Sequence, residues 1–63
     1  MVNVKFPDGT SVTVSSGTVD EILAKLELNP YEYLVTCDGE LLINDEFVED
    51  NKTLVLVSIV HGG

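Results

Sequence analysis

The segment that most constrains this chain is Leu54–Val60, which is aliphatic throughout apart from Ser58. Such side chains fit a pleated, buried surface, so the segment is predicted to form a β-strand. Neither of its two alternating sets of side chains is polar: Leu54, Leu56 and Val60 fall on one side, and Val55, Val57 and Ile59 on the other. A single helix covers only one face of a sheet, so the other side of this strand is predicted to be exposed.

The last three residues, His61, Gly62 and Gly63, come directly after this predicted strand. Glycine has no side chain to bury and loses much entropy on ordering, so a Gly-Gly tail contributes little to packing. A tail of this kind also arises by chance at a disordered terminus. Its place straight after a hydrophobic strand favours a functional tail, which would enter a narrow channel in another protein. We expect one domain over residues 1–60 and a flexible tail over 61–63.

The composition limits the classes of partner. The 63 residues include 11 Asp and Glu, three Lys and no Arg. Nucleic-acid binding needs clustered basic residues, so this balance argues against a nucleic-acid partner. It suits a basic protein partner, or it serves solubility or reflects a salt-rich cytoplasm. No apolar run approaches the roughly 20 residues that cross a membrane. The lone Cys37, without a signal-peptide pattern, favours a cytoplasmic protein.

The N-terminal segment predicts a β-hairpin. Val2–Phe6 and Ser11–Val14 both alternate apolar and polar residues, and Pro7–Thr10 between them has turn chemistry. This pattern predicts two paired strands. The side chains predicted to face inward are Val2, Val4, Phe6, Val12 and Val14.

A short helix is predicted after the Ser15–Gly17 loop. Thr18 and Glu21 have the spacing of a capping box, in which each side chain accepts a hydrogen bond from the other residue's backbone N–H. Pro30 ends the helix near Leu26 or Glu27. The apolar stripe at helical spacing consists of Val19, Ile22, Leu23 and Leu26.

The C-terminal half predicts strands at Tyr33–Cys37 and Glu40–Ile43, joined by an Asp38-Gly39 turn. Asn44–Thr53 is predicted to be a connecting loop with one helical turn around Asp45–Val48. The predicted order is therefore β-β-α-β-β-β.

Like the last strand, Tyr33–Cys37 has no polar side, so an outward apolar patch is predicted beside the tail. Exposed patches of this kind usually mark contact surfaces, although a loop or a second copy of the chain would also cover one. The patch is predicted to bind a partner protein and comprises Leu34, Thr36, Val55, Val57, Ile59 and, in the tail, His61.

No catalytic or metal site is predicted. The only histidine is His61, around which no ordered base–nucleophile pair can be built, and the ligand sets of zinc, calcium or iron–sulfur sites are missing. Cys37 is interpreted as a small core-facing residue. The group left with chemistry is the α-carboxylate of Gly63, which becomes a good acyl donor once ATP has adenylated it. The chain is therefore predicted to be a substrate, not an enzyme, with no bound cofactor and with the ATP site on a partner.

Several of these motifs together resemble the ubiquitin-like sulfur carriers, a group that includes ThiS, MoaD, the ubiquitin-related modifier and the small archaeal modifier proteins. The motifs are Thr18-x-x-Glu21-Ile22-Leu23, Leu28-x-Pro30, Val35-x-x-Asp38-Gly39, an acidic loop, and a last strand that closes on Gly62-Gly63. The short acidic chain and residues 26–32 are most similar to the archaeal modifiers. Asn51 stands where many relatives have glycine before the last strand.

The resemblance implies an α+β, β-grasp (ubiquitin-like) ββαβββ fold, a mixed sheet packed on one helix. It also implies an adenylating partner of the ubiquitin-activating type and conversion of Gly63 to a thiocarboxylate or an isopeptide conjugate. Further partners would be a sulfurtransferase or a downstream synthase for thiazole, molybdopterin or tRNA thiolation, or lysines of target proteins. Lys5, Lys25 and Lys52 are the candidate acceptors for self-conjugation. The alternative is a non-covalent interaction module that docks a partner through the apolar sheet face.

Overall fold

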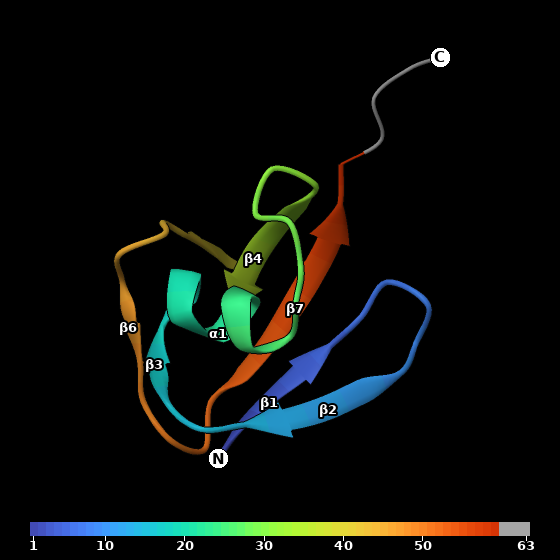
Figure 1. Cartoon of the computed structure of the whole chain (residues 1–63). Coiled ribbons are helices and arrows are strands. Elements are labelled where there is room, and N and C mark those ends of the chain that lie inside the picture. Colours follow the sequence, from blue (N-terminus) through green and yellow to red (C-terminus); the bar gives the residue numbers. More distant parts are fainter. Residues whose placement is uncertain (60–63) are drawn as a thin grey trace.

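The computed structural model describes residues 1–59, and its main feature is a five-stranded mixed sheet with one helix packed on it (Figure 1). The strand order is β2-β1-β7-β4-β5, so the last strand of the chain lies in the middle. Strand β1 pairs with β7 in parallel, and the other neighbours pair antiparallel. The strands are β1 (Val2–Lys5), β2 (Ser11–Val14), β4 (Tyr33–Cys37), β5 (Glu40–Leu42) and β7 (Thr53–Ser58). This is the β-grasp arrangement predicted from the sequence.

The predicted N-terminal hairpin is confirmed, with Val2 opposite Val14 and Val4 opposite Val12. Val2 and Val4 are fully buried, and Phe6 and Val14 pack against the core. Val12 lies on the inner face, opposite Val4, as predicted, but its side chain is 38% exposed. Strand β2 is at the edge of the sheet and has no further strand beside it within residues 1–59, so the helix and its neighbours leave Val12 partly uncovered.

Helix α1 (Val19–Lys25) begins at the predicted capping box. The hydroxyl of Thr18 accepts from the backbone N–H of Glu21 at 3.2 Å, and the Glu21 carboxylate accepts from the N–H of Thr18 at 2.8 Å. Seven residues are too few for a helix that is stable alone, so α1 depends on its packing against the sheet. Its buried residues are Val19, Ile22 and Leu23.

The helix ends at Lys25 with Leu26 as its C-cap, close to the predicted end, and the chain leaves it in a Schellman motif. The N–H of Leu28 donates to the carbonyl of Leu23 at 2.9 Å, and the N–H of Glu27 donates to the carbonyl of Ala24 at 3.1 Å. Glu27 occupies the left-handed position of this motif, with φ 58°. Glycine is the usual residue at that position, so Glu27 keeps a conformation that its Cβ disfavours.

The segment between β5 and β7 does not contain the predicted helical turn at Asp45–Val48. Instead, β6 (Phe47–Val48) pairs with β3 (Gly17–Thr18), which begins inside the predicted Ser15–Gly17 loop, as a second, two-stranded sheet. The carbonyls of Glu46 and Asn44 accept from the N–H groups of Val19 and Asp20, both at 3.0 Å. The first backbone N–H groups of an α-helix have no acceptor within the helix, and here those of Val19 and Asp20 find acceptors in this segment. A helical turn in the segment would remove these hydrogen bonds.

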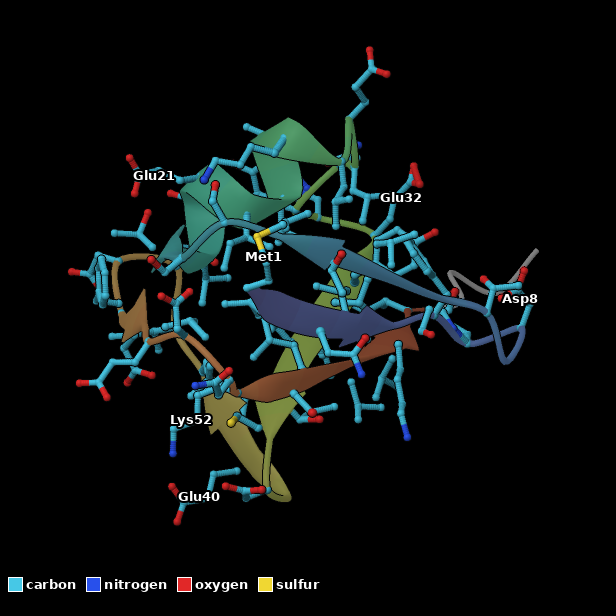
Figure 2. All side chains as sticks on the ribbon, turned by 90° about the horizontal axis from the view of Figure 1, so that it is seen from below. Met1, Asp8, Glu21, Glu32, Glu40 and Lys52 are labelled. Atoms are coloured by element: carbon cyan, nitrogen blue, oxygen red, sulfur yellow. The ribbon has the colours of Figure 1, made fainter. Side chains whose placement is uncertain are left out.

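The core lies between α1 and the inner face of the sheet. Figure 2 shows the helix on one side of the strands only. The buried hydrophobic residues are Val2, Val4, Val19, Ile22, Leu23, Val35, Val48, Leu54 and Leu56. Cys37 is a free thiol, half-buried and packed against this cluster, as predicted. The predicted domain boundary after residue 60 and the tail over 61–63 lie outside the described residues.

Candidate functional site

The candidate site is the outer face of the sheet, on the side away from α1. Along β7 the side chains alternate between the two faces. Leu54 and Leu56 are 1% and 2% exposed, whereas Val55 and Val57 are 41% and 44% exposed. The middle strand of the sheet therefore presents aliphatic side chains to solvent, as the sequence predicted.

Strand β4 extends this surface. Leu34 lies opposite Val57 and is 43% exposed, and Thr36 lies opposite Val55. The hydroxyl of Thr36 donates to the backbone carbonyl of Val55 at 3.0 Å. Two neighbouring strands thus present a contiguous surface of mainly aliphatic side chains. The hydroxyl of Thr36, which is on this surface, already donates its hydrogen bond within the sheet.

Two exposed residues of this surface, Leu41 and Ile43, were missed by the sequence analysis. Leu41 lies opposite Thr36, which places it on the outer face, and both residues are 59% exposed. The sequence held a signal for Leu41. Asp38 and Gly39 both have positive φ, as a two-residue type I′ turn requires. That turn sets Cys37 opposite Glu40, and therefore Thr36 opposite Leu41.

The exposed aliphatic residues Leu34, Leu41, Ile43, Val55 and Val57 together form what we call the outer patch. It covers only the part of the outer face formed by β7, β4 and β5. The outer face is thus divided into an apolar half, which lies toward β5, and a polar half. The register places these polar residues on the same face of β1 and β2: Asn3, Lys5, Ser11 and Thr13.

A groove of about 510 Å³ continues the patch around the end of β5. Its apolar lining includes Tyr31, Tyr33, Leu34, Leu41, Ile43 and Ile59. Ile59 comes directly after β7, is half-buried, and donates its N–H to the carbonyl of Glu32 at 2.8 Å. The groove therefore opens beside the last residue that the structure describes.

The segment that contains β4 and β5 is strongly acidic. Residues 26–51 carry eight of the 11 acidic residues and none of the lysines: Glu27, Glu32, Asp38, Glu40, Asp45, Glu46, Glu49 and Asp50. Figure 2 shows Glu32 and Glu40 projecting outward from the ribbon. Lys5, beside Val55 in the parallel β1–β7 pair, is the nearest lysine in the register. A partner with basic side chains around an apolar centre would complement this surface.

The three lysines differ in their surroundings. The Lys25 ammonium donates to the hydroxyl of Ser15 at 2.7 Å and to the carbonyls of Ser15 and Ser16 at 3.4 and 3.3 Å. Within residues 1–59, the side chains of Lys5 and Lys52 make no such hydrogen bond. Lys25 therefore holds the loop before α1, whereas the ammonium groups of the other two meet solvent.

The pKa shifts that the structure shows belong to local caps, away from the outer patch. The pKa of Glu21 is lowered, chiefly because the backbone N–H of Thr18 donates to its carboxylate. The pKa of Asp8 is lowered because the hydroxyl and N–H of Thr10 donate to it, at 2.7 and 3.0 Å. Both shifts accompany short-range hydrogen bonds within a turn or a capping box.

Residues 1–59 contain neither a metal-ligand cluster nor a membrane-spanning helix. No group of three His, Cys, Asp or Glu residues in this range could hold a metal ion. No helix in the same range is long and apolar enough to span a membrane. The predicted site residues His61, Gly62 and Gly63 lie outside the described residues, so their roles stay predictions.

Comparison with known proteins identifies the fold. No protein-family model matches the chain, and no curated protein matches it. A solved structure does: the solution NMR structure of a computationally designed protein based on the template of human erythrocytic ubiquitin. The TM-score is 0.69 at 24% sequence identity, and the match covers 98% of this chain and 94% of the other. The likeness extends over nearly the whole length of both proteins, and at this identity it establishes the fold alone.

Proposed function

We propose that this ubiquitin-like β-grasp domain is a sulfur carrier, a protein modifier, or both, with the Gly63 carboxylate as its reactive group. A partner enzyme of the ubiquitin-activating type would bind the outer patch and adenylate that carboxylate. The domain itself would act as the protein substrate of this enzyme. Its fold would supply recognition, and the partner would supply the ATP site.

The chemistry proceeds in two displacements. The carboxylate oxygen of Gly63 attacks the α-phosphorus of ATP, and pyrophosphate leaves, which gives an acyl-adenylate. A sulfur or amine nucleophile then attacks the acyl carbon, and AMP leaves with the electrons of the C–O bond. A cysteine thiolate gives a thioester and a sulfide equivalent gives a thiocarboxylate, while a lysine amine gives an isopeptide bond. Glycine suits the acyl position because no side chain hinders the approach of the nucleophile.

The observation that supports this proposal best is the place of β7 in the fold. The strand is central in the sheet and exposes Val55 and Val57. After β7 ends at Ser58, three residues precede Gly62-Gly63 in the sequence. A partner bound to the outer patch would therefore contact the strand that leads into the tail. A Gly-Gly end that follows a docking strand closely in the sequence is what delivery into a foreign active site requires.

The downstream step stays open between sulfur delivery and conjugation. Delivery would serve thiazole, molybdopterin or tRNA thiolation through a sulfurtransferase or a synthase. Conjugation would use a lysine of a target protein. For self-conjugation, Lys5 and Lys52, whose ammonium groups have no hydrogen-bond partner within residues 1–59, are favoured over Lys25, whose hydrogen bonds to the Ser15–Ser16 loop would have to break.

The test is intact mass spectrometry of the full chain after incubation with ATP and the activating enzyme of its host. We expect the mass of an acyl-adenylate, and in protein purified from the host an exchange of oxygen for sulfur. Deletion of Gly63 should abolish both changes and leave the melting temperature unchanged. Absence of both mass changes in the intact chain would refute the proposal.

A second candidate function is a non-covalent interaction module, which the exposed outer patch favours by itself. The two candidates differ in their need for the tail. In a module, removal of Gly62 and Gly63 leaves partner binding and function intact, whereas Val57→Asp abolishes them. In a carrier, both changes destroy function. Comparing the two variants in one host assay therefore separates the candidates.

A further inference from the structure

The groove beside β5 exists because β5 stops before its neighbour does. Strand β4 has five residues paired with β7, but only Val35, Thr36 and Cys37 have partners on β5. Beyond Leu42 the chain turns away, and the carbonyl of Ile43 accepts from the N–H of Glu46 at 3.2 Å. The first part of β4 is therefore a second sheet edge, next to a groove with an apolar lining.

The backbone of Tyr33 points into this gap. The N–H of Ile59 donates to the carbonyl of Glu32, so Glu32 and, by alternation, Leu34 direct their backbone groups toward β7. Tyr33 lies between them and directs its N–H and C=O to the opposite side. Neither group has a backbone partner within residues 1–59. The gap thus offers one donor and one acceptor in line with β5.

The charge of the surroundings indicates which occupant fits. Asp45 lines the groove, and Glu32 directly precedes Tyr33, which also lines it. No lysine lies between residues 26 and 51. A second copy of this chain would bring its own net charge of −8 against the same acidic surface. A basic segment would be attracted to it.

We infer that the groove binds an extended segment of a partner protein in which lysine or arginine flanks a short run of aliphatic residues. The segment continues the line of β5 and pairs with the N–H and C=O of Tyr33. One aliphatic side chain enters the groove between Leu34, Ile43 and Ile59, and the basic side chains lie toward Glu32 and Asp45. This is strand addition to a sheet edge, in which backbone pairing supplies affinity and side-chain pockets supply specificity.

This mode of binding is independent of the acyl chemistry of Gly63. It uses the β4 edge and the groove, whereas the proposed activating enzyme covers the outer patch over β7 and β4. Leu34, Leu41 and Ile43 belong to both surfaces. A binding test without ATP and without enzyme keeps the two apart: its failure would leave the proposed function standing, and failure of the proposed function would leave this inference standing.

The experiment titrates the ¹⁵N-labelled full chain with the synthetic peptide Lys-Val-Leu-Val-Lys, blocked at both ends. We expect saturable NMR shifts at Tyr33, Leu34, Ile43 and Asp45, and slower hydrogen exchange of the Tyr33 amide. Raising the salt to about 0.5 M should weaken binding several-fold, because exposed charges are screened. A peptide with glutamate in place of lysine should not bind. A peptide N-methylated at its central leucine should bind at least tenfold more weakly, because it loses a backbone donor.

A matched pair of variants locates the site. Ile43 and Phe47 are both exposed, at 59% and 64%, but Phe47 lies on β6 and outside the groove. Ile43→Lys should weaken peptide binding at least tenfold, whereas Phe47→Lys, with the same change in net charge, should change it less than twofold. Equal weakening by both variants, shifts confined to Val55 and Val57, or no saturable binding would each overturn the inference. Concentration-dependent dimerisation through β4 without peptide would overturn it in favour of a second copy.

Discussion

The side chains on the two faces of β7 are chemically similar, but those on one face are buried and those on the other are exposed. Leu54 and Leu56 lie under the helix and are almost fully buried, whereas Val55 and Val57, one residue along, are more than two-fifths exposed. Strand propensity does not distinguish them, because all four fit a pleated sheet. What separates them is α1, which covers one face of the sheet. The inner face stabilises the fold, and aliphatic residues on the outer face stay exposed to solvent.

The comparison is tested most strongly by truncating one residue on each face. Leu56→Ala removes a side chain that is 2% exposed and should cost about 2–5 kcal/mol. A domain this small has only about 3–5 kcal/mol from its core, so much of the variant should be unfolded in water. Val57→Ala should cost less than about 1 kcal/mol, the full span of β-propensity effects. Urea unfolding followed by circular dichroism measures both changes. Similar losses for the two variants would show that the outer face is covered in solution.

The next test concerns the Thr18–Glu21 capping box at the start of α1, the helix that covers the inner face. Thr18→Ala removes the hydroxyl that accepts from the N–H of Glu21 and should cost about 1 kcal/mol of unfolding free energy. Thr18→Ser keeps an oxygen at this position and should stay within a few tenths of a kcal/mol of the parent chain. The midpoints of urea unfolding for both variants give the comparison. If the serine variant loses as much as the alanine variant, the methyl group and not the cap stabilises the helix.

The inner face and its helix could be predicted from the sequence, because their signals are local. Alternation of valines identifies β1, and the Thr18–Glu21 spacing identifies the start of α1. The β3–β6 pair could not be predicted. Each strand has two residues, which is too short for a periodic pattern, and the pairing depends on carbonyls of Asn44 and Glu46 reaching α1. Contacts of that kind depend on tertiary structure, which residue spacing does not reveal.

The outer patch could be predicted in part. Leu34, Val55 and Val57 were identified because two strands lack a polar side, and the structure exposes all three. Leu41 required the hairpin register, which the Asp38-Gly39 turn contains. The groove could not be predicted, because it arises where β5 ends at Leu42 and that end is set by the turn toward Glu46. The end of a strand such as β5 depends on where the next segment of the chain packs, and residue patterns within the strand do not contain that information.

A smaller effect on the unfolding free energy is expected at Glu27, directly after the C-cap of α1. Glu27 has φ 58°, a conformation that costs residues with a Cβ more than glycine. Glu27→Gly should therefore raise the unfolding free energy by about 0.5 kcal/mol, the gain in the folded state exceeding the added entropy of the unfolded chain. Glu27→Ala removes the same charge and keeps the Cβ, so it should give no such gain. A gain for alanine equal to that for glycine would assign the effect to charge, and thermal unfolding measures both.

The smallest effect is a pH dependence that the capping box confers on the helix and hence on the inner face. The pKa of Glu21 is lowered in the folded state, chiefly by the hydrogen bond from the N–H of Thr18. A carboxyl group with a lowered folded pKa contributes stability above its unfolded pKa, about 4.3 for glutamate. That contribution is lost as the pH falls through the folded pKa. The parent chain should therefore exceed Glu21→Gln in stability more at pH 7 than at pH 3.

Net charge complicates this last measurement, because acid also neutralises the other carboxylates of a chain with a net charge of −8. Protonation relieves their mutual repulsion and by itself favours the compact state. Glu49→Gln is the matched control, because it removes the same charge from an exposed residue outside the capping box. Urea midpoints at pH 7 and pH 3 for the three proteins isolate the contribution of the cap. An identical pH dependence in both variants would mean that Glu21 acts only through its charge, and that α1 is held over the inner face by the Thr18 hydroxyl and by packing.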